Sequence, residues 1–316
     1  MADMVQIFKT EDGTIHQIDE AESGCWIALT DPTATEILEI AERYDIDPDH
    51  LKAPTDEEER SRIESEDDYS LILVDIPVIE ERNEKDWYVT IPLGIIMHSD
   101  IMITVCLEET PILNAFMDGR VKGFYTYWKT RFILQILYRN ATQYLQYLRI
   151  IDKKSDLIGQ NLHKSQRNQE LIELLELEKS LVYFSTSLRA NEVVLEKLLK
   201  SEKIKKYPED TDLLEDVIIE NKQALEMANI YSGILNSTME AFASIISNNL
   251  NIVMKFLTTV TIVLSIPTMV ASIYGMNVNL VGMPFATDPN GFWIVLGFAA
   301  LLTGVIAWIF AKKNLF

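Results

Sequence analysis

The chain has 316 residues, a formal net charge of −20 and two cysteines. This acidity excludes nucleic acid as a partner, because nucleic-acid phosphates are bound by lysine and arginine. Attraction of cations and a merely soluble acidic surface both fit it. Cys25 and Cys106 lie far apart without further ligand residues at metal-binding spacing, which excludes a disulfide framework and indicates a reducing compartment.

The negative charge is concentrated in the first 250 residues. The charged side chains after that point are Lys255, Asp288, Lys312 and Lys313, which sum to +2, so the first 250 residues carry −22. No basic stretch followed by an apolar run begins the sequence, so we expect no signal peptide and a cytosolic acidic part.

Residues 1–125 are predicted to form an α+β cytosolic domain with an α/β sandwich architecture. Two short apolar segments flank an Asp-Gly pair and predict a hairpin over 7–18. Helical spacing over 33–44 predicts a helix, with Asp31 as its N-terminal cap.

Three further segments of this domain are predicted to be strands from their β-branched and apolar residues. They are 71–79, 87–97 and 101–107. Pro77 and Pro92 are expected at edges of the sheet, because proline has no N–H to donate to a ladder.

Residues 126–250 are predicted to be a helical cytosolic region. One helix is expected around 132–148 and a second from about 150 to 200. A turn is predicted at 203–210, which contains Pro208.

The longest predicted helix runs from about 212 to 274 and has no proline before Pro267. It would extend about 90 Å and continue from the cytosolic region into a membrane. A heptad seam runs along it at alternating spacings of three and four. Its positions are Leu214, Val217, Asn221, Ala224, Ala228, Tyr231, Leu235, Thr238, Phe242, Ile245, Asn249, Ile252, Phe256, Thr259, Val263, Ile266, Val270 and Ile273.

The heptad seam fits either packing within one subunit or self-association. We favour self-association, because two membrane helices alone cannot enclose a pore.

Residues 251–316 are predicted to be a transmembrane region with spans at about 254–274 and 292–311, joined by an extracellular loop at 275–291. Each apolar run is long enough for a hydrocarbon core of about 30 Å, which needs roughly 20 helical residues. Lysines flank the two outer ends of the pair and are missing from the loop, so both termini are expected in the cytoplasm. The chain is therefore predicted to be a multi-pass protein of the cell membrane (inner or plasma membrane), in contact with lipid.

A polar stripe lies one residue away from the heptad seam on the first span. It comprises Asn251, Met254, Thr258, Thr261, Ser265, Thr268 and Ser272. Such residues belong at a helix contact or against water. Because the stripe continues along the whole span to Asn277, we favour a water-lined path, which Met254 and Leu257 could close as apolar rings.

Gly275, Met276 and Asn277 stand at the outer end of this path. Glycine permits a sharp backbone turn. The path has no carboxylate, which disfavours a bare divalent ion, whereas Mg²⁺ releases its waters reluctantly and neutral oxygens can hold its hydration shell.

The segments Val253-Met254-Lys255 and Tyr274-Gly275-Met276-Asn277, the second span and the basic end Lys312-Lys313 resemble the CorA family of magnesium channels. The resemblance implies a funnel-shaped homopentamer that carries Mg²⁺, with Co²⁺ and Ni²⁺ as further permeants. It also implies that Gly275, Met276 and Asn277 are the selectivity filter. The implied pore-lining and gating residues are Asn251, Met254, Leu257, Thr258, Thr261, Leu264, Ser265, Thr268 and Ser272.

Two positions depart from the family pattern. Ser265 replaces a bulky apolar residue, and the outer loop lacks the usual acid, for which Asp288 is a substitute.

The resemblance also implies closure by cytosolic Mg²⁺ bound between neighbouring subunits. Asp216 matches the acidic position on the long helix, and Glu80 is its expected partner. The acidic runs 56–59 and 64–68 are expected to be solvated. The four histidines show no ligand spacing: they are His16, His50, His98 and His163.

No enzyme motif is found in the sequence, so an enzyme is not expected. Two alternatives to a magnesium channel remain. One is a zinc or other divalent-cation transporter of the same superfamily, with or without a proton as the driving ion, although Met276 in the filter disfavours it. The other is a non-conducting two-span coiled-coil sensor, in which the polar stripe is a dry seam.

Overall fold

The computed structural model describes residues 5–82, 85–165, 168–201, 207–279 and 282–313. The chain divides into two compact units, residues 1–239 and 240–316. The first unit joins the predicted α/β domain to most of the predicted helical region.

The first unit contains a seven-stranded sheet in the order β2-β1-β3-β7-β6-β5-β4. The strands β3 and β7 are parallel, and every other neighbouring pair is antiparallel. The strands are β1 (Val5–Glu11), β2 (Thr14–Gln17), β3 (Trp26–Thr30), β4 (Arg62–Ser65), β5 (Tyr69–Arg82), β6 (Lys85–His98) and β7 (Met102–Cys106).

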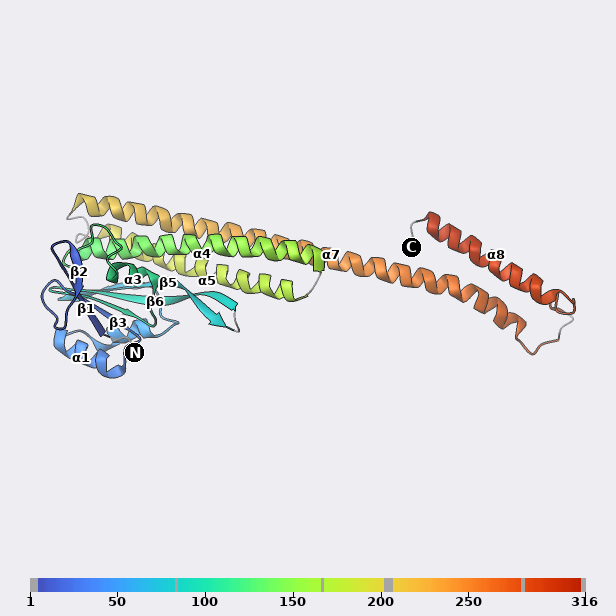
Figure 1. Ribbon diagram of the computed structural model, residues 1–316, viewed down its shortest axis with the longest axis horizontal. Helices are drawn as coiled ribbons and strands as arrows, with labels where there is room; N and C mark the ends of the chain where they lie inside the picture. Colours follow the sequence, from blue (N-terminus) through green and yellow to red (C-terminus); the bar gives the residue numbers. More distant parts are fainter. Residues whose placement is uncertain (1–4, 83–84, 166–167, 202–206, 280–281, 314–316) are drawn as a thin grey trace. The chain divides into compact units, whose positions relative to one another are not determined.

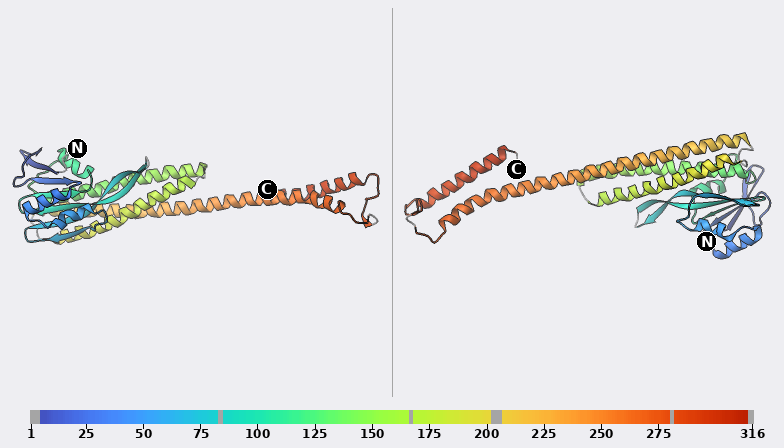
Figure 2. Two further views of the ribbon diagram at one scale, coloured as in Figure 1. Left: turned by 90° about the horizontal axis from the view of Figure 1, so that it is seen from below. Right: turned by 180° about the vertical axis from the view of Figure 1, so that it is seen from behind.

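Helices cover both faces of this sheet, as the sandwich prediction required (Figure 1). One face packs against α1 (Ala34–Tyr44) and α2 (Pro48–Lys52), which continues into the short helix η1 (Ala53–Thr55). The other face packs against α3 (Pro111–Met117), α4 (Lys129–Ser165), α5 (Asn168–Lys200) and the start of α7 (Pro208–Tyr274). The views in Figure 2 place the long helices on this same face.

The predicted hairpin, the first helix and the three strands are confirmed, but the predicted cap of α1 is wrong. The cap is Thr33, whose hydroxyl accepts from Glu36 N while Glu36 bonds back to the Thr33 backbone. This reciprocal capping box satisfies two backbone donors at once. Asp31 instead adopts a positive φ of 49° in the turn before it.

The two prolines lie at edges as expected, because no third strand of the described residues pairs with β5 or β6 at their positions. Strand β5 pairs with β4 through Leu73, and β6 pairs with β7 only from Leu93 onward. Pro77 and Pro92 lie beyond those limits, in a two-stranded arm with open outer sides, where a missing N–H costs no ladder bond.

A side-chain amide takes the place of a strand at the open side of β5. Asn191 of α5 accepts from Asp75 N at 2.9 Å and donates to Asp75 O at 2.8 Å. The same carbonyl also accepts from Asn140 and Tyr144 of α4. These bonds fix α4 and α5 against the sheet, because buried backbone groups require partners.

The predicted helix boundaries need two corrections. The expected break at about 150 is wrong, because α4 continues to Ser165 and α5 begins at Asn168. Pro208 is the first residue of α7 rather than part of a turn, since proline is tolerated in a first helical turn. Of the predicted turn, residues 203–206 lie outside the described part of the chain.

The first half of the heptad seam packs within the chain. Leu214, Val217, Asn221, Ala224, Ala228 and Leu235 are buried without any second subunit. Asn221 donates to Leu188 O of α5 at 3.0 Å. Packing within one subunit, the other alternative that the sequence left open, therefore accounts for this stretch of the seam.

The second unit consists of the rest of α7 and of α8 (Gly291–Lys312), which folds back beside it (Figure 1). Both helices are long and apolar enough to cross a membrane. Thr259 on α7 and Ala299 on α8 are buried in this unit.

Candidate functional site

The polar stripe and the middle of the heptad seam differ in exposure on α7. In the membrane segment, Thr259 of the seam is buried and Val263, Ile266 and Val270 are partly buried, whereas Phe256 and Ile273 at its ends are exposed. All seven residues of the polar stripe, together with Leu257 and Leu264, are exposed in the isolated chain. The nine predicted pore-lining residues therefore lie on a side of α7 that α8 leaves uncovered.

Three hydroxyls of the stripe donate to their own helix. Thr261 donates to Leu257 O at 2.8 Å, Ser265 to Ile262 O at 2.8 Å and Thr268 to Leu264 O at 3.1 Å. Each proton is thereby used, and the oxygen keeps a lone pair that can accept from outside the helix. A row of acceptors suits the waters around a cation, which point their hydrogens outward.

The helix α7 ends at Tyr274, directly before the Gly-Met-Asn motif. Gly275 N donates to Ala271 O at 2.9 Å, and Met276 N to Ile273 O at 3.4 Å. Gly275, Met276 and Asn277 are all exposed.

Gly275 follows the last residue of α7 without a left-handed backbone conformation. Among the described glycines, Gly13, Gly24, Gly119 and Gly123 have a positive φ, and Gly275 does not. A Cβ at Gly275 would lie 3.4 Å from Ala271 O, at the limit of ordinary contact. The glycine therefore keeps the last helical carbonyls accessible rather than allowing a left-handed turn.

The loop after the motif is bound to both helices. The Tyr274 hydroxyl donates to Pro284 O at 3.0 Å. The Asp288 carboxylate accepts from Asn290 N at 2.8 Å ahead of α8. Asp288 and Gly275 line one cavity of about 620 Å³ between α7 and α8, which Val270 and Val295 also line.

The two predicted regulatory acids lie apart within one chain. Asp216 is exposed on α7, and Glu80 lies on the β5–β6 arm, where it pairs with Arg82. No contact joins Asp216 to Glu80 among the described residues.

Glu80 has acidic neighbours that sequence reasoning missed. The pKa of Glu108 is raised, first by partial burial and then by the charges of Glu80 and Glu57. These three carboxyls come from separate segments, so no local sequence signal marks them.

One histidine has ligand neighbours, contrary to expectation. His50 lies beside Glu64 and Glu66, which the sequence placed in a solvated run. The sequence analysis considered spacing between histidines only, and the neighbours of His50 are acids of the run 64–68. His163 lies in the part of α4 whose side chains are not described.

The chain matches the family described as CorA-like Mg²⁺ transporter protein over residues 21–313. The cobalt/magnesium transport protein CorA of Methanocaldococcus jannaschii is 27% identical over 298 residues, which cover 92% of this chain and 90% of the relative. The magnesium transport protein CorA of Helicobacter pylori is 21% identical over 299 residues, with the same coverage of 92% and 90%.

A solved structure shares the whole fold. The complete structure of the CorA magnesium transporter from Methanocaldococcus jannaschii aligns with a TM-score of 0.85 at 24% identity. The alignment covers 99% of this chain and 98% of that one.

Proposed function

Because the chain belongs to the CorA-like Mg²⁺ transporter family, we propose that it is a membrane channel through which hydrated Mg²⁺ enters the cell. Co²⁺ and Ni²⁺ are further permeants, in keeping with the cobalt/magnesium name of one relative. The protein acts as a transporter and not as an enzyme, and the cation is its substrate.

The observation that carries this proposal is the uncovered polar stripe on α7. Three of its hydroxyls already donate to helix carbonyls, so their outward oxygens act as acceptors. In lipid such a row of acceptors would lack partners. Along a water-filled path, the same oxygens hold the water shell of a divalent cation without removing it.

Several copies of α7 are needed to enclose such a path. We assign a funnel-shaped homopentamer in which α8 faces lipid and the stripe of each subunit faces the axis. Met254 and Leu257, which are 53% and 56% exposed, form the cytosolic constriction. Apolar rings of this kind close a pore by excluding water.

At the outer mouth, five Asn277 carboxamides offer one oxygen per subunit to the waters of the ion. Gly275 leaves the last helical carbonyls accessible beneath them. Asp288 takes the place of the missing loop acid, because it is the one carboxylate in the sequence of the loop. Both termini lie in the cytoplasm.

Cytosolic Mg²⁺ closes the channel by binding Asp216 of one subunit and Glu80 of the next. Facing carboxylates repel one another when no cation lies between them and attract a shared cation when it is present. Loss of Mg²⁺ therefore shifts the population toward the open state. Arg82 competes for Glu80, which keeps this site weak enough to respond to the cytosolic concentration.

Purified protein in liposomes with a trapped Mg²⁺ dye tests the proposal. We expect Mg²⁺ influx driven by a negative interior voltage, and loss of that influx in Asn277→Ala with the oligomer intact. Flux that ignores voltage and requires a pH gradient would favour a proton-driven zinc or other divalent transporter. No flux of any divalent ion would favour a non-conducting sensor.

A further inference from the structure

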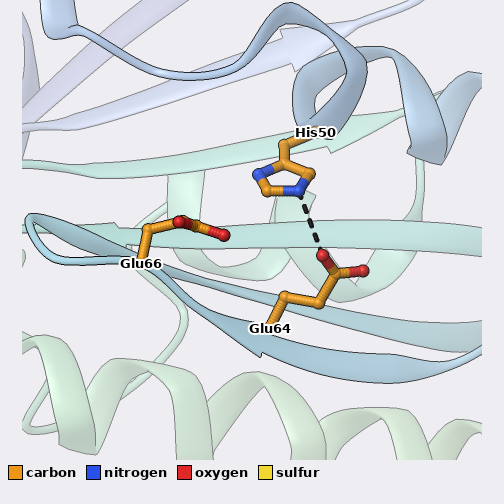
Figure 3. A group of neighbouring side chains, drawn as sticks. All are labelled: His50, Glu64 and Glu66. Carbon is orange, nitrogen blue, oxygen red and sulfur yellow. Dashed lines mark hydrogen bonds and ion pairs between the residues drawn. The ribbon is translucent and has the colours of Figure 1, made fainter.

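Three metal-binding side chains from separate segments converge on the α2 side of the sheet, in the first unit. They are His50 of α2, Glu64 of β4 and Glu66 in the turn between β4 and β5 (Figure 3). One ligand atom from each lies within 4.8 Å of the others. We call them the His50 cluster.

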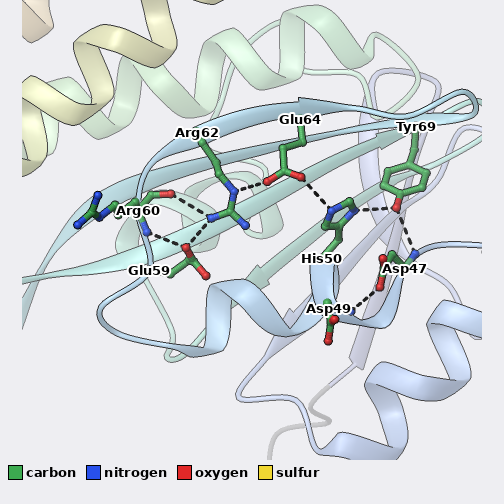
Figure 4. Close-up of polar contacts among 8 residues, drawn as sticks. All are labelled: Asp47, Asp49, His50, Glu59, Arg60, Arg62, Glu64 and Tyr69. Atoms are coloured by element: carbon green, nitrogen blue, oxygen red, sulfur yellow. Dashed lines mark hydrogen bonds and ion pairs between the residues drawn. The ribbon is translucent and has the colours of Figure 1, made fainter.

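The imidazole of His50 is held in a fixed orientation. Its Nδ1 lies 2.7 Å from the Tyr69 hydroxyl, which also accepts from Asp47 N at 3.1 Å. Its Nε2 lies 3.1 Å from Glu64 Oε2, and the side chain is 13% exposed. Figure 4 shows the ring fixed between Tyr69 and Glu64. Metal-binding histidines have this arrangement, with one nitrogen bonded to a protein oxygen and the other directed at the ion.

The other oxygen of Glu64 is paired with an arginine. Arg62 bonds to Glu64 Oε1 and also to Glu59. Arg62 therefore leaves Oε2 available on the side of His50. Three glutamates (Glu59, Glu64 and Glu66) and one arginine leave a local charge of −2 when His50 is neutral, which a divalent cation balances.

We propose that the His50 cluster binds a divalent transition-metal ion of the Zn²⁺ type. An imidazole with two carboxylates suits such ions, whereas Mg²⁺ prefers oxygen ligands and retains its waters. Zinc bonds of about 2.0–2.1 Å place tetrahedral ligand atoms about 3.3 Å apart. His50 and Glu64 are already that close, and Glu66 is exposed on a turn from which its carboxylate can approach.

This site is separate from the transport path. It lies in the α/β sandwich, and its three ligands include none of the residues assigned to the pore or to closure by Mg²⁺. A solvent molecule completes the fourth position, as in open zinc sites. A failure of the proposed Mg²⁺ conduction would therefore leave the proposed zinc site unaffected.

Metal binding by the full-length protein in detergent tests the site. Protein stripped with a chelator is dialysed against Zn²⁺ in a large excess of Mg²⁺, and bound Zn²⁺ per chain is measured. We expect wild type to bind one more equivalent than His50→Gln and Glu66→Gln. The control variants His16→Gln and Asp67→Asn, which alter exposed side chains, keep that equivalent.

The Zn²⁺ affinity of a separate variant tests whether Tyr69 supports His50. Tyr69→Phe retains the ligands but loses the bond to Nδ1, so its Zn²⁺ affinity falls about tenfold, at the lower end for such supporting residues.

Three results would overturn the assignment. They are wild-type protein that retains no Zn²⁺ against the Mg²⁺ excess, Glu66→Gln that binds as much as wild type, and His16→Gln that loses as much as His50→Gln. Glu66→Gln keeps the test decisive if His50→Gln fails to fold, because the Glu66 bond to Tyr69 O comes from the backbone.

Discussion

The hydroxyl of Tyr274, the last residue of α7, donates to the carbonyl of Pro284 at 3.0 Å. This bond ties the residue directly before the Gly-Met-Asn motif to the loop that carries Asp288. The proposed filter and the proposed loop acid are thereby held in one local structure, which depends on a contact between residues ten positions apart.

Replacing Tyr274 with Phe removes this bond and leaves the ring. A single hydrogen bond contributes about 0.5–1.5 kcal/mol, so we expect Mg²⁺ influx at low external concentration to fall by up to about tenfold. The initial rate against external Mg²⁺ measures the effect in liposomes. Tyr183→Phe on α5 is the matched control, and equal curves for the two variants would remove Tyr274 from the account.

Replacing Asp216 with Ala weakens closure by internal Mg²⁺. A carboxylate bound to a cation contributes more than a neutral hydrogen bond, so we expect the inhibitory Mg²⁺ concentration to rise about tenfold. Flux at graded internal Mg²⁺ measures the shift. Glu215→Ala, at the exposed neighbouring acid, should respond as wild type does. Closure of Asp216→Ala at the wild-type concentration would contradict the proposed regulation.

Asp75 supplies a prediction about pH. Burial is the first cause of its raised pKa, and hydrogen bonds from Ser187 and Ser61 oppose the shift. Folding therefore favours the protonated carboxyl. The contribution of Asp75 to stability is therefore greatest below its unfolded pKa of about 3.9 and is lost as the pH rises through its folded pKa.

Asp75→Asn removes the buried charge and should raise the thermal midpoint at pH 7. The rise should be about 2–4 °C for each kcal/mol gained. The gain should vanish below about pH 4, where both side chains are neutral. Thermal unfolding of the full chain in detergent measures it, with Asp67→Asn in an exposed turn as control. A gain that persists at low pH, or none at pH 7, would show that desolvation of Asp75 is not the cause.

The predictions that the structure confirms rest on long or local patterns. The helix over 212–274 and the apolar second span were predictable because their periodicity and composition extend over many turns. The hairpin near Asp12-Gly13 was predictable from its turn residues. The strand Trp26–Thr30 was missed, because a short buried run in the middle of a sheet has no alternating pattern.

What the sequence could not predict depends on contacts between distant segments. The Asn191 amide bonds to Asp75 across more than a hundred residues, and His50 meets Glu64 only through the fold. The heptad seam was visible, but its partner was not, since the same spacing serves α5 within the chain and a second subunit equally well. The side of α7 that α8 leaves uncovered likewise required the structure.

The central claim is that the polar stripe faces water, and thiol modification during flux tests it most directly. Cys25 and Cys106 are buried, so a cysteine introduced at Thr268 is the accessible target for a charged, membrane-impermeant thiol reagent. Thr259→Cys, on the buried seam of the same helix, is the control. We expect the reagent to block Mg²⁺ influx through Thr268→Cys and to leave Thr259→Cys unaffected. Thr268→Cys that stays unmodified at low internal Mg²⁺, or that conducts fully once modified, would contradict a water-lined path along this stripe.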